Sequence, residues 1–146
     1  MEIRPFLIRL VEPADAAEIA RLNALFNGVE APAEDYASRL LEPRRVDHPI
    51  LAENNGLAIG LANLRLAPCV FYAEPYAELT ELFVDAAYRR QGVGGGLISF
   101  AEELARQSGA AEMIILTDFY NEAALGLYRS LGYLHHDLAL SKDLRG

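Results

Sequence analysis

The residues best suited to chemistry lie in one stretch of the chain, residues 79–98, where two arginines precede a run of glycines. Leu79–Val84 is rich in β-forming residues, and an apolar period of three to four residues resumes after Gly92, so the stretch predicts a strand, a turn and a helix. Glycines at such a junction let the first backbone N–H groups of the helix approach an anion closely. Because Arg89 and Arg90 add positive charge there, the stretch predicts a site for phosphate or pyrophosphate.

Two common phosphate-binding motifs do not fit this stretch. A dinucleotide-binding Gly-x-Gly-x-x-Gly motif that starts at Gly92 needs a glycine where Leu97 stands. A nucleotide-binding P-loop needs Gly-Lys-Ser/Thr, and the only lysine of the chain is Lys142. What remains is the pattern Arg89-x-x-Gly92-x-Gly94. Taken alone, this pattern is more typical of a flexible turn beside a solvated basic pair.

A second segment gives the short pattern its context. Residues 121–133 read Asn-Glu-Ala-Ala-Leu-Gly-Leu-Tyr-Arg-Ser-Leu-Gly-Tyr. Together and in this order, the two segments resemble the two signatures of the GNAT superfamily, the acyl-CoA-dependent N-acyltransferases. The expected order of strands and helices is similar to that of the family across essentially the whole chain.

Composition limits the class of protein. The chain has 146 residues, of which 52% are hydrophobic and 23% charged, and this predicts one globular domain over residues 1–146. No run approaches the ~20 apolar residues of a membrane span, and the start of the chain lacks a secretory pattern. With a single cysteine as well, we expect a cytoplasmic protein that does not bind membranes. The formal charge of −8 argues against a nucleic-acid partner.

The elements that must position the site follow from periodicity and turn signals. They form a mixed, mostly antiparallel sheet of about seven strands with helices on both faces. Helix 93–108 is a crossover that makes the fourth and fifth strands parallel; the resemblance adds that these two strands splay apart to admit the cofactor. The predicted strands are 6–11, 49–52, 57–66, 76–84, 113–117, 133–134 and 138–140, and the predicted helices are 13–26, 33–41, 93–108 and 121–131.

The resemblance also implies a cofactor and its contacts. Acetyl-CoA would be the co-substrate, and no metal is expected, since none of the three histidines has metal-ligand spacing. The exposed main chain of Leu82 and Val84 would pair with pantetheine, and the Leu82 N–H would point at the thioester carbonyl. The residues implied in cofactor binding are Leu82, Phe83, Val84, Arg89, Arg90, Gln91, Gly92, Val93, Gly94, Gly95 and Asn121.

Three residues are candidates for proton transfer. Tyr128 lies seven residues after Asn121, hence two turns along one helix face, and it matches the tyrosine that protonates the departing sulfur in the family. On a regular strand Glu78, Thr80 and Leu82 share one face, which makes Glu78 the first choice for the base. A β-bulge would instead bring Glu81 to that face, so both carboxylates are kept.

The expected reaction is acetyl transfer to a primary amine of a small molecule or a peptide, by direct attack on the thioester. In the family, the region between Phe26 and Tyr36 tends to wall the acceptor pocket; an ordinary surface loop with core anchors is an equal alternative. The competing function is a non-catalytic module that senses acyl-CoA. The sequence leaves the acceptor unidentified, and it leaves open whether the chain forms a homodimer.

Overall fold

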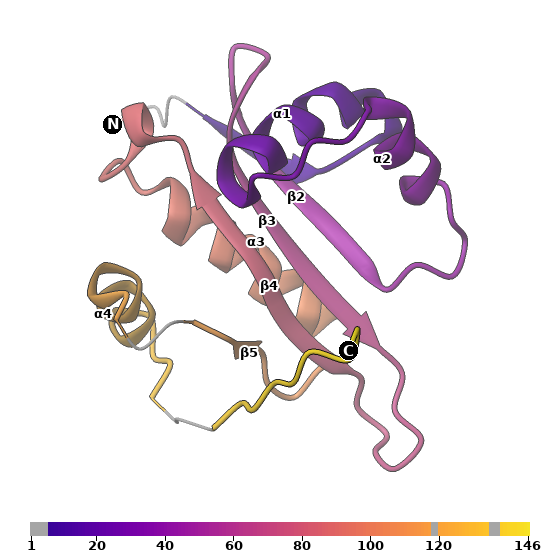
Figure 1. The fold of residues 1–146 in the computed structure, drawn as a ribbon. Helices are drawn as coiled ribbons and strands as arrows, with labels where there is room; N and C mark the ends of the chain where they lie inside the picture. Colours follow the sequence, from indigo (N-terminus) through magenta and orange to yellow (C-terminus); the bar gives the residue numbers. More distant parts are fainter. Residues whose placement is uncertain (1–5, 118–119, 135–137) are drawn as a thin grey trace. The chain divides into compact units, whose positions relative to one another are not determined.

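The structure is a computed structural model that describes residues 6–117, 120–134 and 138–146 (Figure 1). The chain divides into two compact units, Met1–Ile115 and Leu116–Gly146. The first unit holds the sheet and helices α1 (Ala16–Asn27), α2 (Ala33–Leu40) and α3 (Val93–Gln107), and the second holds helix α4 (Glu122–Ser130). That residues 1–146 form one domain stays a prediction.

The first unit is built on one mixed sheet. Its order is β1-β2-β3-β4-β5, in which the first four strands are antiparallel neighbours and β5 pairs in parallel with β4. This confirms the mixed, mostly antiparallel sheet with parallel fourth and fifth strands. The strands are β1 (Leu7–Leu10), β2 (Asp47–Asn54), β3 (Leu57–Ala67), β4 (Tyr76–Val84) and β5 (Ile114–Ile115).

The expected count of about seven strands is wrong, because the described residues form five. Residues 133–134 and 138–140 are not strands. The backbone N–H of Tyr133 donates to the carbonyl oxygen of Tyr128 at 3.0 Å, so it closes helix α4 and is not available to a ladder. Leu138 and Leu140 are 82% and 86% exposed, and a run of three residues without a buried face cannot hold a register.

The turn between β2 and β3 confirms the strongest local signal of the sequence. Asn55 and Gly56 are its two loop residues, with φ angles of 50° and 84°. Two consecutive positive φ angles define a type I′ turn, whose twist matches that of the flanking strands. The Asn-Gly pair therefore sets the register of the two central strands.

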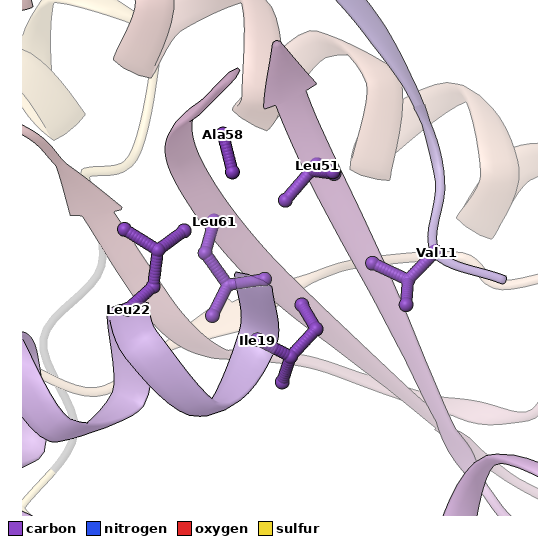
Figure 2. Close-up of a cluster of buried hydrophobic side chains, with 6 residues drawn as sticks. All are labelled: Val11, Ile19, Leu22, Leu51, Ala58 and Leu61. Carbon is purple, nitrogen blue, oxygen red and sulfur yellow. The ribbon is translucent and has the colours of Figure 1, made fainter. Parts of the chain in front are cut away.

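Helices cover both faces of the sheet, as expected (Figure 1). On one face, α1 (Ala16–Asn27) follows a short 3-10 turn, Pro13–Asp15, and packs beside α2 (Ala33–Leu40). Figure 2 shows Ile19 and Leu22 of α1 over Leu51 and Leu61 of the sheet, with Val11 and Ala58 at the edges of this cluster.

Helix α3 (Val93–Gln107) packs against the opposite face. Its apolar stripe is buried, since Val93, Leu97, Ile98 and Ala101 are each at most 1% exposed. We call the face under α1 and α2 the α1 face, and the face under α3 the α3 face.

Candidate functional site

Strand β4 carries a bulge at Thr80. The register pairs Asn63 of β3 with Glu81, but the next residue, Leu64, pairs with Leu79. Thr80 is therefore the extra residue on β4, and the normal alternation of side chains is broken there.

The bulge places both candidate carboxylates on one face of the sheet. Glu78 and Glu81 pair with Arg65 and Asn63, which are two residues apart on β3 and so share a face. This is the α1 face, because Leu61, two residues further along β3, belongs to the cluster beneath α1. The alternative predicted from the sequence, a β-bulge that brings Glu81 round, is therefore present, and Glu81 joins Glu78 on this face without replacing it. The grouping of Glu78 with Leu82 on a regular strand is wrong, because Leu82 pairs with Ala62 and so belongs to the other face.

Glu78 and Glu81 accept hydrogen bonds from neutral groups. The Tyr76 hydroxyl donates to Glu78 Oε1 at 2.8 Å, and Asn27 Nδ2 donates to Glu81 Oε2 at 3.3 Å. Burial, and then the hydrogen bond to the Glu78 carboxylate, raise the pKa of Tyr76 to about 12, so this hydroxyl stays protonated at neutral pH. In the part of the chain that the structure describes, neither carboxylate forms an ion pair.

The nearby cation is already paired. Arg65 donates to both carboxylate oxygens of Asp47, through Nε at 2.8 Å and Nη2 at 3.2 Å. The Arg65 guanidinium in turn lowers the pKa of Asp47. Since this pair is formally neutral, the two carboxylates of β4 leave a net negative charge on this part of the α1 face.

Asn63 fixes the bulge from the neighbouring strand. It is 8% exposed, and its Nδ2 donates to Thr80 Oγ1 at 2.8 Å. Its Oδ1 is buried and has no hydrogen-bond partner within the described residues. This residue was not among the predicted site residues, although a polar residue inside the apolar run 57–66 is a visible signal.

The end of α1 reaches the same part of β4. The Phe26 ring lies 4.9 Å from the Phe83 ring, centroid to centroid, and the partly buried Phe83 side chain packs against the core cluster beneath α1. Asn23 Nδ2 donates to the Tyr36 hydroxyl at 2.7 Å and joins α1 to α2. Phe26 and Asn27 of the predicted 26–36 region therefore lie beside Phe83 and Glu81. Contact of this region with an acceptor stays a prediction.

Beyond Leu79, one edge of β4 has no strand partner in the described first unit. Pairing with β5 ends at Leu79 and Ile115. The Asp85 N–H donates to Ile59 of β3, so by the alternation of strand groups the N–H groups of Leu82 and Val84 point to the opposite, open edge.

A turn connects this edge to α3. Asp85 caps the 3-10 turn Ala86–Tyr88 by accepting from the Ala87 N–H at 3.0 Å, and Arg89 Nε donates to the Val84 carbonyl at 3.2 Å. Arg90 and Gly92 both have positive φ angles, of 63° and 84°.

Helix α3 presents free amides at its start. Its first backbone bond runs from the Gly96 N–H to the Gly92 carbonyl at 3.0 Å. The N–H groups of Val93, Gly94 and Gly95 therefore have no partner within the helix, and this is the arrangement that binds anions at helix N-termini. Gln91 lies just before them, with Nε2 only 3.5 Å from the Ala87 carbonyl.

Two glycines whose role the sequence did not reveal set how closely α3 approaches the sheet. A Cβ on Gly60 would lie 3.1 Å from the Phe83 carbonyl oxygen and 3.1 Å from Val93 Cγ1. A Cβ on Gly96 would lie 2.6 Å from Ile8 Cδ1. The glycine run thus serves packing as well as the proposed anion site.

The second unit contains the other candidates. Asn121 is the N-cap of α4, as predicted, and its side chain accepts from the Ala124 N–H at 3.2 Å. Tyr128 is buried and packs edge-on against Tyr133, with ring centroids 6.3 Å apart. Burial raises the pKa of Tyr128, which keeps its hydroxyl protonated at neutral pH. The roles of Asn121 and Tyr128 in binding and catalysis stay predictions.

Among the residues that the structure describes, no group of three or more His, Cys, Asp and Glu side chains could hold a metal. His135 and His136 lie outside the described residues. Within the same described part, no helix is both long and apolar enough to cross a bilayer.

Comparison with known proteins identifies the family. Residues 16–133 match the Acetyltransferase (GNAT) family. The uncharacterized N-acetyltransferase YhfO of Bacillus subtilis (strain 168) is 33% identical over 131 residues, covering 86% of this chain and 88% of that protein. The aminoalkylphosphonate N-acetyltransferase of Salmonella typhimurium (strain LT2) is 31% identical over 115 residues, covering 79% and 73%.

A solved structure agrees in fold. The aminoglycoside N-acetyltransferase AAC(6')-Iy in complex with CoA superposes with a TM-score of 0.80 at 21% identity, covering 97% of this chain and 95% of that chain. The family match spans most of the chain, and the resemblance drawn from the two sequence segments is confirmed. The chain belongs to the GNAT family of acetyltransferases.

Proposed function

We propose that this protein transfers an acetyl group from acetyl-CoA to a primary amine of a small molecule or a peptide. The observation that carries the proposal is the open edge of β4, which lies beside the free amides at the start of α3. An extended pantetheine can pair with such an edge, and a pyrophosphate suits such amides. The family relationship makes acetyl-CoA the expected donor.

Each proposed contact has a physical role. The Leu82 N–H would donate to the thioester carbonyl oxygen, and one preorganised donor of this kind is typically worth about 3 kcal/mol in the transition state. Arg89 and Arg90 would add positive charge beside the pyrophosphate. The full proposed set for CoA is Leu82, Phe83, Val84, Arg89, Arg90, Gln91, Gly92, Val93, Gly94, Gly95 and Asn121.

The proposed reaction is direct. The lone pair of the neutral amine forms the new C–N bond, and the electron pair of the C–S bond leaves with sulfur. The nitrogen gives up one proton to a carboxylate of β4, Glu78 or Glu81, and Tyr128 supplies one proton to the thiolate.

Charge favours a cationic acceptor. Glu78 and Glu81 accept only neutral hydrogen bonds in the described residues, whereas the nearby Asp47 is paired with Arg65. A field of this sign attracts ammonium groups and repels acids. The relative named for aminoalkylphosphonate acetylation supports a small-molecule amine, but not a cationic one, because a phosphonate is an acid. The preference for a cation rests on the charge of Glu78 and Glu81 alone.

A free-thiol release assay with acetyl-CoA and a broad panel of amines tests the proposal. We expect turnover with cationic amines at low salt, and a kcat/KM that falls as salt rises, because screening weakens the attraction. If neutral or acidic amines are all better acceptors than every cationic amine, the acceptor class is wrong even though the acetyl transfer stands.

The second candidate function is an acyl-CoA sensor without turnover. The same free amides and open strand edge would serve it, so binding alone does not distinguish the two. A chain that acetyl-CoA stabilises against heat but that releases no thiol with any amine would support the sensor.

A further inference from the structure

The two carboxylates of β4 differ in what holds them. Glu78 is bonded within its own strand, to the hydroxyl of Tyr76 at 2.8 Å. Glu81 is bonded across the α1 face, to Asn27 Nδ2 in the last turn of α1 at 3.3 Å. Among the described residues, Glu81 is therefore the one of the two that is bonded to α1, the helix that leads into the region expected to wall the acceptor.

Asn27 is itself held in place by a chain of side-chain hydrogen bonds. Asn27 Nδ2 also donates to Asn23 Oδ1 at 2.6 Å, and Asn23 Nδ2 donates to the Tyr36 hydroxyl of α2 at 2.7 Å. The two asparagines are four residues apart and so lie on one face of α1. Because Phe26 of the same turn packs on Phe83 of β4, with ring centroids 4.9 Å apart, the last turn of α1 is anchored against β4.

The register also separates the two carboxylates by their distance from the proposed carbonyl site. Leu82 pairs with Ala62, Glu81 with Asn63 and Glu78 with Arg65. Counted by their partners on β3, Glu81 lies one position from Leu82, and Glu78 lies three positions from it. At the usual rise of a strand, these separations along the strand are ~3.4 Å for Glu81 and ~10 Å for Glu78. A group that removes a proton must come within hydrogen-bond reach of the reacting nitrogen, and Glu81 has the shorter path.

We propose that Glu81 is the carboxylate that takes the acceptor's proton, and that Asn27 is the positioning residue that holds it for this step. The inference rests on the proposed acetyltransferase function and deepens it. The proton moves from the attacking nitrogen to a Glu81 carboxylate oxygen while the C–N bond forms. The resulting carboxylic acid returns the proton to solvent after the product leaves. Glu78 acts only through its charge, by attracting a cationic acceptor.

Variants at three positions test this assignment in the full chain. Glu81→Gln should lower kcat by about 100-fold or more, the usual contribution of a general base. Glu78→Gln, the matched control, should mainly raise KM for a cationic amine. Asn27→Ala should lower kcat about tenfold, in the wild type and equally in the Glu78→Gln background. In the Glu81→Gln background, Asn27→Ala should lower kcat no further, because the carboxylate that Asn27 positions is gone.

Three results overturn the proposal. An equal loss from Asn27→Ala in the Glu81→Gln background would make Asn27 merely structural. A larger loss of kcat from Glu78→Gln than from Glu81→Gln would make Glu78 the base. A wild-type chain that CoA stabilises but that acetylates no amine refutes the proposed function itself, which the first two results do not. If Asn27→Ala fails to fold, Asn27→Gln replaces it, because its amide is displaced by one methylene. Asn27→Gln should then lower kcat in the wild type and in Glu78→Gln, but not in Glu81→Gln.

Discussion

The neighbouring glycines Gly95 and Gly96 should respond in opposite ways to the same substitution by valine. A Cβ on Gly95 meets nothing within 4 Å, whereas a Cβ on Gly96 would lie 2.6 Å from Ile8 Cδ1 and 3.6 Å from the Phe6 ring. Gly95 belongs to the free amides at the start of α3, and Gly96 faces β1. Gly95→Val should therefore impair CoA binding, and Gly96→Val should impair folding.

The expected magnitudes follow from these surroundings. Valine favours a helix over glycine by about 0.4 kcal/mol, so the free energy of unfolding of Gly95→Val should equal that of the wild type or slightly exceed it. At Gly96, the added Cβ would meet the terminal methyl of the Ile8 side chain, which can turn aside, so the overpacking costs about 1 kcal/mol, the low end of the usual range. For a chain of this length, that difference corresponds to a melting temperature lower by about 2 to 4 °C.

Thermal and urea unfolding with and without CoA measure both effects. At 100 times its dissociation constant, CoA should add about 2.7 kcal/mol to the free energy of unfolding of the wild type. Gly95→Val should fold normally and lose most of this gain. Gly96→Val should have a lower free energy of unfolding than the wild type and should still be stabilised by CoA to the same extent. A full CoA response in Gly95→Val would refute the proposed pyrophosphate site, and wild-type stability of Gly96→Val would refute the close packing of α3 on β1.

Three further predictions concern single side chains. Tyr128→Phe should leave the urea midpoint nearly unchanged and lower kcat, less so for acyl donors whose thiol leaves easily; an unchanged kcat would leave Tyr128 a core aromatic. Asn63→Leu should keep or raise the urea midpoint, because an unsatisfied buried acceptor costs about 1 to 3 kcal/mol, and a clear loss would show that its bond to Thr80 dominates. The hydrogen bond from Arg9 lowers the pKa of Asp15 below its ordinary 3.8, so the unfolded state binds more protons and stability falls as pH drops through this range. Asp15→Asn should flatten that fall in urea titrations from about pH 5 to pH 2, and an equally steep fall would refute it.

Several parts of this protein were predictable because their signals are local. Asn55 and Gly56 can adopt two positive φ angles in succession, so the hairpin of β2 and β3 was visible in the sequence. The strand, basic turn and glycine-started helix of residues 79–98 needed only propensity and periodicity. Asn121 was readable as an N-cap for the same reason.

The face on which the carboxylates lie was decided by tertiary structure. Strand periodicity separates Glu78 from Glu81, and only the pairing of β4 with β3 adds the bulge at Thr80 that brings them together. Where a bulge falls depends on a partner strand, here on the buried Asn63, and no pattern within β4 encodes it. The prediction of the last two strands was wrong for a related reason. Tyr133 has β propensity, but its backbone N–H bonds to the Tyr128 carbonyl and closes α4.

The same distinction holds for the proposed base, Glu81, and its positioning residue, Asn27. The sequence by itself supplied an asparagine near the end of an amphipathic helix and an acidic residue in a strand, both unremarkable. Asn27 and Glu81 are 54 residues apart, and they meet because the apolar stripe of α1 must cover Leu51 and Leu61 on the sheet. Burial of apolar surface is what stabilises α1 in this position on the sheet. The hydrogen bond follows from the packing, and for this reason it could not be found before the fold was known.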